Sequence, residues 1–253
     1  RQMCIRDRDW QQGGVTRQKG LDPLWMLNHM HYLDSGRGGN WPLTFSRYAG
    51  PGSHRYPVGF SGDTIVTWES LAFQPQFTAT ASNIGYGWWS HDIGGHMFGY
   101  RNEELEARWY QLGAFSPINR LHSSNSPFSG KEPWNFNRDV SAAMVDALRL
   151  RHAMMPYLYT MNYRAAEAGR PLVEPMYWQN PDTPDAYEVP DEFRFGTELV
   201  VAPIVSPDDA AACRGRADAW LPQGEWFDFF DGRRYVSSDA AGRRLEVWRS
   251  LDR

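Results

Sequence analysis

Cysteine is scarce in this 253-residue chain, which contains only Cys4 and Cys213. Two cysteines cannot build the disulfide framework of a small secreted domain, and their scarcity is compatible with a reducing compartment. Long apolar runs are missing too, because the best one, residues 199–205, is far shorter than the roughly 20 residues that span a membrane. No apolar signal-peptide core follows the basic start. The sequence therefore predicts no membrane span and leaves the cellular location open.

An excess of basic residues is also absent, since 26 Lys and Arg stand against 30 Asp and Glu, for a net charge of −4. This balance lacks the electrostatic footprint of a nucleic-acid-binding protein. Aromatic residues are abundant instead: they form 15% of the chain, with 12 tryptophans. Tryptophan faces and N–H groups suit contacts with carbohydrate, but large cores also bury many of them. Composition alone keeps both interpretations open.

Three segments in the first half of the chain end a short apolar run with a polar residue and then turn at glycine. Arg47 follows one run, Asp63 lies in the GFSGDT segment at residues 59–64, and Asp92 lies in the WWSHDIGGH segment at residues 88–96. A parallel strand presents a side chain to a site at its C-terminal end in this way. The pattern predicts an α/β fold in which the three side chains share one edge of a parallel sheet.

Hydrophobic periodicity predicts alternating strands and helices over the first two thirds of the chain. Residues 102–112 have helical spacing after an acidic first turn, which suits the positive end of a helix. Residues 139–166 form the longest helical pattern; Pro156 within it predicts a kink or two helices, and Gly169 is the expected stop. Strands are expected at residues 43–46, 84–88 and 172–177.

The character of the chain changes after residue 180. Three prolines and five acidic residues between residues 181 and 192 indicate a surface connection. Beyond it, residues 198–203 and 220–235 are typical of short strands separated by turns. The sequence thus predicts a domain boundary near Asp191 and an all-β second domain.

Several of these segments resemble glycoside hydrolase family 31, the α-glucosidase and α-xylosidase family, in order and in spacing. Residues 9–13 are similar to the segment that carries the nucleophile of that family, and residues 221–228 resemble the start of the β-sandwich behind its barrel. The central segments that carry the resemblance are residues 45–63, 87–95 and 115–122.

The resemblance implies the C-terminal half of a (β/α)8 TIM barrel at residues 9–190, followed by the start of an all-β sandwich at residues 191–253. Residues 1–8 do not fit, because a barrel strand before Asp9 should be apolar, whereas Arg6-Asp7-Arg8 stands there. We interpret residues 1–8 as a non-native tail joined to an incomplete gene; a short disordered tail is the alternative. With an open barrel edge, the chain expressed alone is predicted to be insoluble or molten and inactive.

Hydrolysis of a glycoside with retention needs two carboxyl groups about 5 Å apart, one a nucleophile and the other an acid/base. The resemblance implies that Asp9 is the nucleophile and that Asp63 is the acid/base, with Phe60 as an apolar, substrate-contacting wall beside it. Judged without the resemblance, an aspartate after glycine is more often a turn residue.

Three further residues match family positions that contact the sugar. The guanidinium fork of Arg47 can hold two hydroxyls or steady nearby carboxylates. Asp92 and His122 match residues that hydrogen-bond the same sugar's hydroxyls. A structural salt bridge is the alternative for Arg47, and a satisfied core histidine is the alternative for His122.

Histidines near these segments raise the question of a metal site. His29 and His31 alternate, and His91 adjoins Asp92 with His96 close by, which are residue types that ligate zinc. However, His29 and His31 fall in a segment with helical features, where residues two apart point in different directions. We therefore predict no metal and no cofactor.

These inferences predict a retaining α-glycoside hydrolase that acts on α-glucosides or related α-glycosides by double displacement, with an α-linked oligosaccharide or glycoside as its substrate. A transglycosylase or a lyase would use the same site, and a non-catalytic carbohydrate-binding fragment is a further alternative. Product analysis with and without an acceptor separates transglycosylation and elimination from hydrolysis. The glycone, glucose or xylose, and the oligomeric state stay open.

Overall fold

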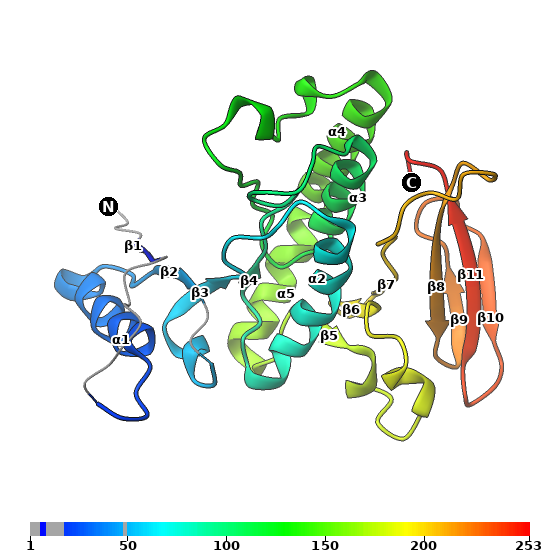
Figure 1. Cartoon of the computed structure of the whole chain (residues 1–253). Helices are drawn as coiled ribbons and strands as arrows, with labels where there is room; N and C mark the ends of the chain where they lie inside the picture. Colours follow the sequence, from blue (N-terminus) through cyan, green and yellow to red (C-terminus); the bar gives the residue numbers. More distant parts are fainter. Residues whose placement is uncertain (1–5, 9–17, 48–49) are drawn as a thin grey trace.

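The computed structural model describes residues 6–8, 18–47 and 50–253, so the predicted nucleophile Asp9 lies outside the described residues. Its first sheet has four strands in the order β1-β2-β3-β4, all parallel (Figure 1). The strands are β1 (Arg6–Arg8), β2 (Thr44–Arg47), β3 (Pro57–Phe60) and β4 (Trp89–Ser90). The parallel sheet predicted from the three glycine-turn segments is therefore present, and β2 confirms the strand expected at residues 43–46.

The strand expected at residues 84–88 was placed too early. Residues Ser82–Ile84 form a 3-10 helix that ends at Gly85, whose φ of 76° lies in the left-handed region. The chain joins the sheet only where the Gly59 amide donates to the Trp88 carbonyl, at 2.9 Å, and β4 starts one residue later. The apolar run alone could not show that a left-handed glycine interrupts it.

Within the described residues, five α-helices accompany the sheet (Figure 1). Asn102 caps α3 by accepting a hydrogen bond from the Leu105 amide at 2.9 Å, as an N-cap side chain should. The long helical pattern divides at Met154, and Pro156 lies in the first turn of the second helix, where proline needs no amide partner. The prediction of two helices is confirmed. The helices are α1 (Pro23–Ser35), α2 (Trp68–Ala81), α3 (Glu103–Ala114), α4 (Arg138–Ala153) and α5 (Met155–Ala168).

An antiparallel sheet follows, in the order β5-β6-β7. It consists of β5 (Val173–Pro175), β6 (Phe193–Phe195) and β7 (Leu199–Val201). The strand expected at residues 172–177 is thus confirmed in its first half, although it pairs antiparallel with β6 and gives way to a 3-10 helix, Met176–Trp178. The predicted boundary near Asp191 falls between β5 and β6 of this sheet and stays a prediction.

Two antiparallel pairs end the chain. β8 (Gly215–Leu221) pairs with β11 (Arg243–Arg249), and β9 (Gly224–Phe227) pairs with β10 (Arg234–Ser237). They lie on the side of the helices away from β1 (Figure 1). The all-β character predicted for this region is confirmed.

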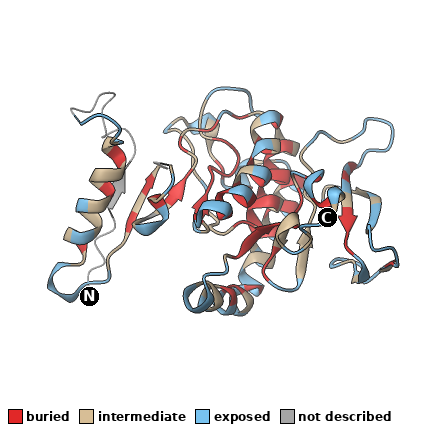
Figure 2. Ribbon diagram, turned by 90° about the horizontal axis from the view of Figure 1, so that it is seen from below, coloured by how far each residue is buried: buried red, intermediate tan, exposed pale blue. Residues whose placement is uncertain are grey.

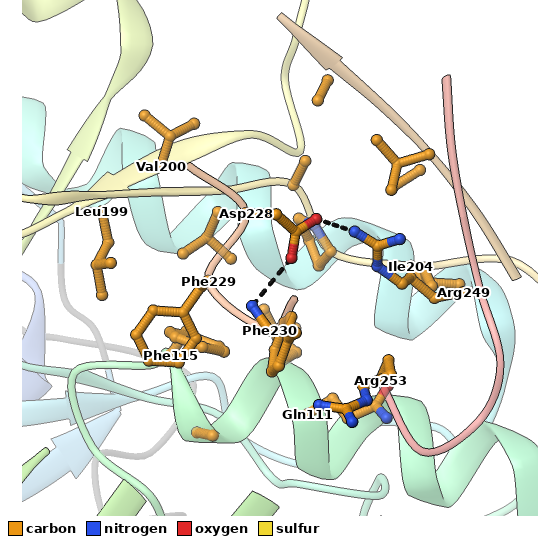
Figure 3. Close-up of a pocket in the computed structure, with 18 of the residues that line it drawn as sticks. Gln111, Phe115, Leu199, Val200, Ile204, Asp228, Phe229, Phe230, Arg249 and Arg253 are labelled. Carbon is orange, nitrogen blue, oxygen red and sulfur yellow. Dashed lines mark hydrogen bonds and ion pairs between the residues drawn. The ribbon is translucent and has the colours of Figure 1, made fainter. Parts of the chain in front are cut away.

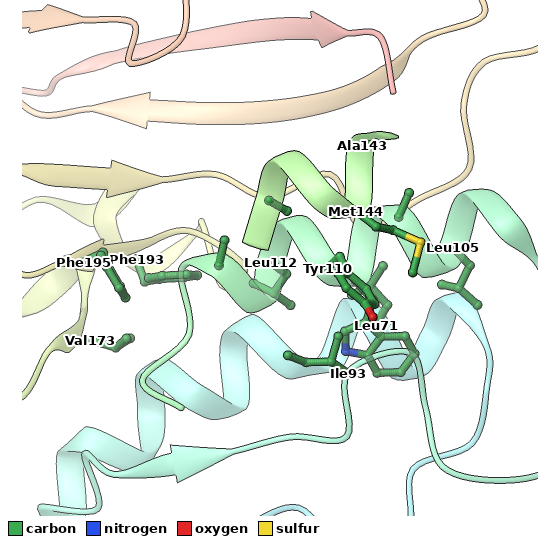
Figure 4. Close-up of a cluster of buried hydrophobic side chains, with 14 of the residues drawn as sticks. Leu71, Ile93, Leu105, Tyr110, Leu112, Ala143, Met144, Val173, Phe193 and Phe195 are labelled. Carbon is green, nitrogen blue, oxygen red and sulfur yellow. The ribbon is translucent and has the colours of Figure 1, made fainter. Parts of the chain in front are cut away.

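The main hydrophobic core joins α2, α3 and α4 to β5 and β6 (Figure 4). Leu71, Ile93 and Phe195 are completely buried within it. Figure 2 shows that buried residues concentrate in this helical centre and are sparser toward α1 and toward the C-terminal strands. Ile93, which follows β4 by three residues, belongs to this core, so the segment after β4 is packed against the helices. Among the described helices, none is long and apolar enough to cross a membrane.

Candidate active site

The predicted site residues follow neighbouring strands. Arg47 is the last residue of β2, Phe60 is the last residue of β3 and precedes Asp63 by a short turn, and Asp92 lies just beyond β4. Because β2, β3 and β4 are parallel, their carboxyl ends meet at one edge of the sheet. The structure therefore brings Arg47, Asp63 and Asp92 to one edge of the sheet, as the sequence pattern predicts.

Asp63 lies between two nitrogen-bearing side chains. Arg47 Nη2 is 3.2 Å from Asp63 Oδ2, and His96 Nε2 is 3.6 Å from Asp63 Oδ1. The turn before Asp63 depends on Gly62, whose φ is 77° and where a Cβ would stand 2.6 Å from the guanidinium carbon of Arg47. Glycine is thus needed at this position both for its backbone conformation and for the close approach of Arg47.

Asp92 is completely buried, and Arg120 hydrogen-bonds its Oδ1. Arg120 also donates to Ser90 Oγ at 3.2 Å, and its guanidinium lies 5.0 Å and 5.2 Å from the ring centres of Phe45 and Phe60. Burial raises the pKa of Asp92, although Arg120, two histidines and the Thr64 backbone oppose this. Within the described residues its Oδ2 accepts no hydrogen bond of normal geometry. A buried carboxylate oxygen of this kind is ready to accept from a ligand hydroxyl.

His122 reaches the same place from the next segment of the chain. Its ring stacks on that of His96, with centres 4.5 Å apart and an interplanar angle of 17°. Burial lowers the pKa of His122, while the nearby Asp92 carboxylate opposes this shift. A neutral imidazole here can donate one hydrogen bond and accept another, which suits recognition of a hydroxyl group.

His91 faces away from this cluster into the core. Trp109 Nε1 donates to its Nδ1 at 3.0 Å, so its Nε2 carries the proton and donates to Ser116 Oγ at 2.8 Å. Ser116 in turn donates to the Leu112 carbonyl at 2.9 Å. Burial lowers the pKa of His91 to about 3, so this histidine stays neutral. It anchors the start of the Asp92 loop to α3 and does not belong to the ligand-facing group.

The chemistry of a metal site fits this cluster poorly. Donor atoms of Asp92, His96 and His122 lie within 4.8 Å of one another, a spacing that one ion could bridge. However, Arg120 already neutralises Asp92, and Arg47 adds a second guanidinium at the same edge. A divalent cation would meet both positive charges. His29 lies on α1, so the helix expected for that segment is confirmed. Its Nδ1 lies 2.7 Å from Tyr56 Oη.

Sequence reasoning missed the residues that organise the cluster. In the sequence analysis Arg120 was only part of the segment 115–122 that resembles the family, and His96 was considered only as a metal ligand. Lys131 was not singled out at all, yet its Nζ donates to the Gly94 carbonyl at 2.7 Å and pairs with Glu106 at 3.0 Å, behind the Asp92 loop. A buried lysine and a buried glutamate are costly unless paired, but which residues they meet depends on the folded chain.

A separate cavity of about 590 Å³ lies between α3, α4, β7 and the C-terminal strands (Figure 3). Apolar groups such as Phe115, Leu199 and Phe229 line much of it, and Asp228 pairs with Arg249 at its wall. None of the predicted site residues lines this cavity. It belongs to the junction between the helices and the second β region, and we do not assign the chemistry to it.

Comparison with known proteins supports the resemblance found in the sequence. Residues 8–161 match the family described as glycosyl hydrolases family 31 TIM-barrel domain, and residues 169–249 match the glycosyl hydrolase family 31 C-terminal domain. The chain is 32% identical over 194 residues to alpha-glucosidase 2 of Bacillus thermoamyloliquefaciens, covering 77% of this chain and 24% of that protein. It is 29% identical over 217 residues to the alpha-xylosidase of Saccharolobus solfataricus, covering 83% and 28%.

Solved structures give the same result. A GH31 alpha-xylosidase from a soil metagenome, complexed with xylose, aligns with a TM-score of 0.78 at 26% identity, over 91% of this chain and 36% of that one. A cycloalternan-degrading enzyme from Trueperella pyogenes, in complex with a covalent intermediate, aligns with a TM-score of 0.77 at 26% identity, over 87% and 30%. The chain therefore spans roughly a quarter to a third of these proteins. Since the barrel match alone covers more than half of its residues, the chain belongs to glycoside hydrolase family 31.

Proposed function

We propose that this chain carries the acid/base half of the active site of a retaining α-glycoside hydrolase. The observation that carries the proposal is the meeting of Arg47, Asp63, Asp92 and His122 at the carboxyl edge of β2, β3 and β4. Two relatives at about 30% identity are named alpha-glucosidase and alpha-xylosidase, which supports α-glycosides as the substrate class.

Asp63 would protonate the leaving oxygen and later take a proton from the attacking water. It is 19% exposed in its side chain, so a ligand can reach it. Phe60, the apolar wall that the resemblance implied, is buried and stacks on Phe45 with ring centres 4.7 Å apart. Asp9 is the proposed nucleophile and would attack the anomeric carbon. It lies outside the described part of the chain. Two displacements at that carbon leave its configuration unchanged.

Recognition of the sugar would fall to Asp92 and His122. Oδ2 of Asp92 is a buried acceptor without a hydrogen bond of normal geometry among the described residues, and Arg120 fixes the orientation of the carboxylate by holding its other oxygen. Buried groups that already await a partner discriminate strongly in favour of a ligand that supplies the missing hydroxyl. Arg47 would steady the Asp63 carboxylate, from which its Nη2 lies 3.2 Å away.

The proposal is tested by following the hydrolysis of an aryl α-glucoside and an aryl α-xyloside by proton NMR, with the longest polypeptide that the gene encodes. We expect cleavage of at least one of them, with the α-anomer of the sugar appearing first. Initial release of the β-anomer would contradict retention, and no cleavage of any α-glycoside would contradict the function. Adding a sugar acceptor in the same assay separates hydrolysis from transglycosylation, because only a transglycosylase forms the larger glycoside as its main product.

A further inference from the structure

His96 occupies the centre of the cluster without a role in the function proposed above. Its Nε2 lies 3.6 Å from Asp63 Oδ1, on the opposite carboxylate oxygen from the one that Arg47 contacts. Its ring is stacked on His122, and only 14% of its side chain is exposed. His96 therefore touches the proposed acid/base on one side and a proposed sugar-binding residue on the other.

The backbone at His96 is held from several directions. Its amide donates to the Thr64 carbonyl at 2.6 Å, and its carbonyl accepts from the Ser124 amide at 3.1 Å. Just before it, Gly95 has a φ of 76°, and a Cβ there would stand 2.9 Å from Val66. Such a tightly fitted loop places the imidazole firmly, and Thr64 directly follows Asp63 in the chain. The two side chains are thus positioned relative to each other by their own backbones.

Asp63 itself has more freedom, because it stands on a turn after Gly62 and is partly exposed. A carboxyl group on a turn can rotate about its final bond unless both oxygens are contacted. The Arg47 contact is with Oδ2, and the His96 contact is with Oδ1. An acid/base alternates between the carboxylic acid and the carboxylate during one turnover, and its carboxyl group needs the same orientation in both states.

We propose that His96 is a positioning residue for Asp63, which it orients in both protonation states. A neutral imidazole whose Nε2 carries the hydrogen can donate to Oδ1 in both states, because a carboxyl oxygen keeps lone pairs whether or not the group is protonated, and the acidic O–H then stays available for the leaving oxygen. His96 would therefore hold Oδ1 throughout turnover while Arg47 holds Oδ2, so that the proton is delivered in one direction. This inference rests on the proposed function only in taking Asp63 as the acid/base.

The kinetic test compares His96→Phe and His96→Gln with the parent enzyme, in the longest polypeptide that the gene encodes. Phenylalanine keeps the ring stacked on His122 but removes the nitrogen; glutamine restores a polar group that can donate or accept. For an α-linked disaccharide, whose leaving group is poor, we expect kcat to fall about 100-fold in His96→Phe. In His96→Gln, kcat should be about tenfold higher than in His96→Phe. An activated aryl glycoside should lose much less, and KM should stay nearly constant. His152→Phe, on an exposed position of α4, is the matched control and should retain parent activity.

Equal losses of kcat on both substrates, a change confined to KM, or no recovery by glutamine would overturn the positioning role.

A structural measurement, which needs no catalytic activity, tests the proposal separately if no α-glycoside is cleaved and the proposed function fails. A crystal structure of His96→Phe is expected to show the Asp63 carboxyl in more than one orientation, while the Asp92–Arg120 pair is unchanged. A single Asp63 orientation, identical to that of the parent protein, would overturn the inference on its own.

Discussion

Arg47 Nη2 lies 3.2 Å from Asp63 Oδ2, although the two residues follow different strands of the parallel sheet. Asp63 also contacts His96 through its other oxygen, at 3.6 Å. The acid/base proposed for this chain is therefore held by contacts from β2 and from the loop after β4. A change in either contact should alter catalysis more than it alters the fold.

Gly62→Ala should disturb the Arg47–Asp63 contact directly. The new Cβ would stand 2.6 Å from the guanidinium carbon of Arg47, so the arginine has to move. Displacement of a positioned group by about 1 Å can cost roughly 100-fold in rate, and we expect a fall in kcat of that order. Steady-state kinetics on an α-glycoside measures it.

Gly20→Ala is the matched control for this substitution. Gly20 has almost the same backbone conformation, with a φ of 80°, but none of the described residues lies within 4 Å of its added Cβ. Both variants should lose about 1–2 kcal/mol of stability from a left-handed alanine, and only Gly62→Ala should lose activity. Equal kinetic losses in the two variants would show that the close approach of Arg47 is unimportant.

Glu192 should make the protein less stable as the pH rises. Burial raises its pKa from 4.5 to about 8, and its Oε2 accepts a hydrogen bond from the Trp220 amide at 2.7 Å. Between pH 4.5 and 8 the folded state retains a proton that the unfolded chain has lost, so the free energy of unfolding falls by up to about 1.4 kcal/mol per pH unit in this window.

Glu192→Gln should remove this dependence, because the amide stays neutral and still accepts from Trp220. In the longest polypeptide that the gene encodes, the difference in melting temperature, variant minus parent, should be small near pH 4.5 and should become more positive up to pH 8. Glu167→Gln, at an exposed position of α5, is the control and should show no such trend. A constant difference across the pH range would mean that Glu192 is ionised in the folded protein.

The 253-residue chain by itself should not melt cooperatively. Within the described residues β1 pairs on one side only, with β2, and large apolar side chains such as Trp41, 77% exposed, and Met30, 57% exposed, flank that end of the sheet. The unpaired edge of a parallel sheet favours association with other chains. A free energy of unfolding of about 5–15 kcal/mol is too small to offset many such exposed edges and apolar side chains. Calorimetry should show no sharp transition. A sharp transition together with hydrolysis of an aryl α-glucoside would contradict this expectation.

That Arg47, Asp63 and Asp92 share one edge of the sheet was predictable from sequence because the signal is local. A polar residue after an apolar run, followed by glycine, fixed the places of Arg47, Asp63 and Asp92 before any contact was known. Pro156 likewise predicted the break between α4 and α5, since proline lacks the amide that a helix interior needs.

Other features depend on contacts that no short segment contains. The pairing of Arg120 with Asp92 and of His96 with Asp63 joins side chains from different loops, and only the folded sheet brings them together. The direction of β5 was likewise hidden, because a short apolar run looks the same in a parallel and an antiparallel strand. Residue types could be chosen from sequence, but their partners could not.

The central claim is that Asp63 is the general acid/base of a retaining α-glycosidase, and Asp63→Asn tests it most directly. The measurement is kcat of this variant and of the parent on two α-glycosides of the same sugar, one with a poor alkyl or sugar leaving group and one with an activated aryl leaving group. We predict a loss of about 100-fold or more on the first and a much smaller loss on the second, because a weakly basic leaving oxygen needs little help from an acid. Equal losses on both substrates would remove Asp63 from the acid role and contradict the account.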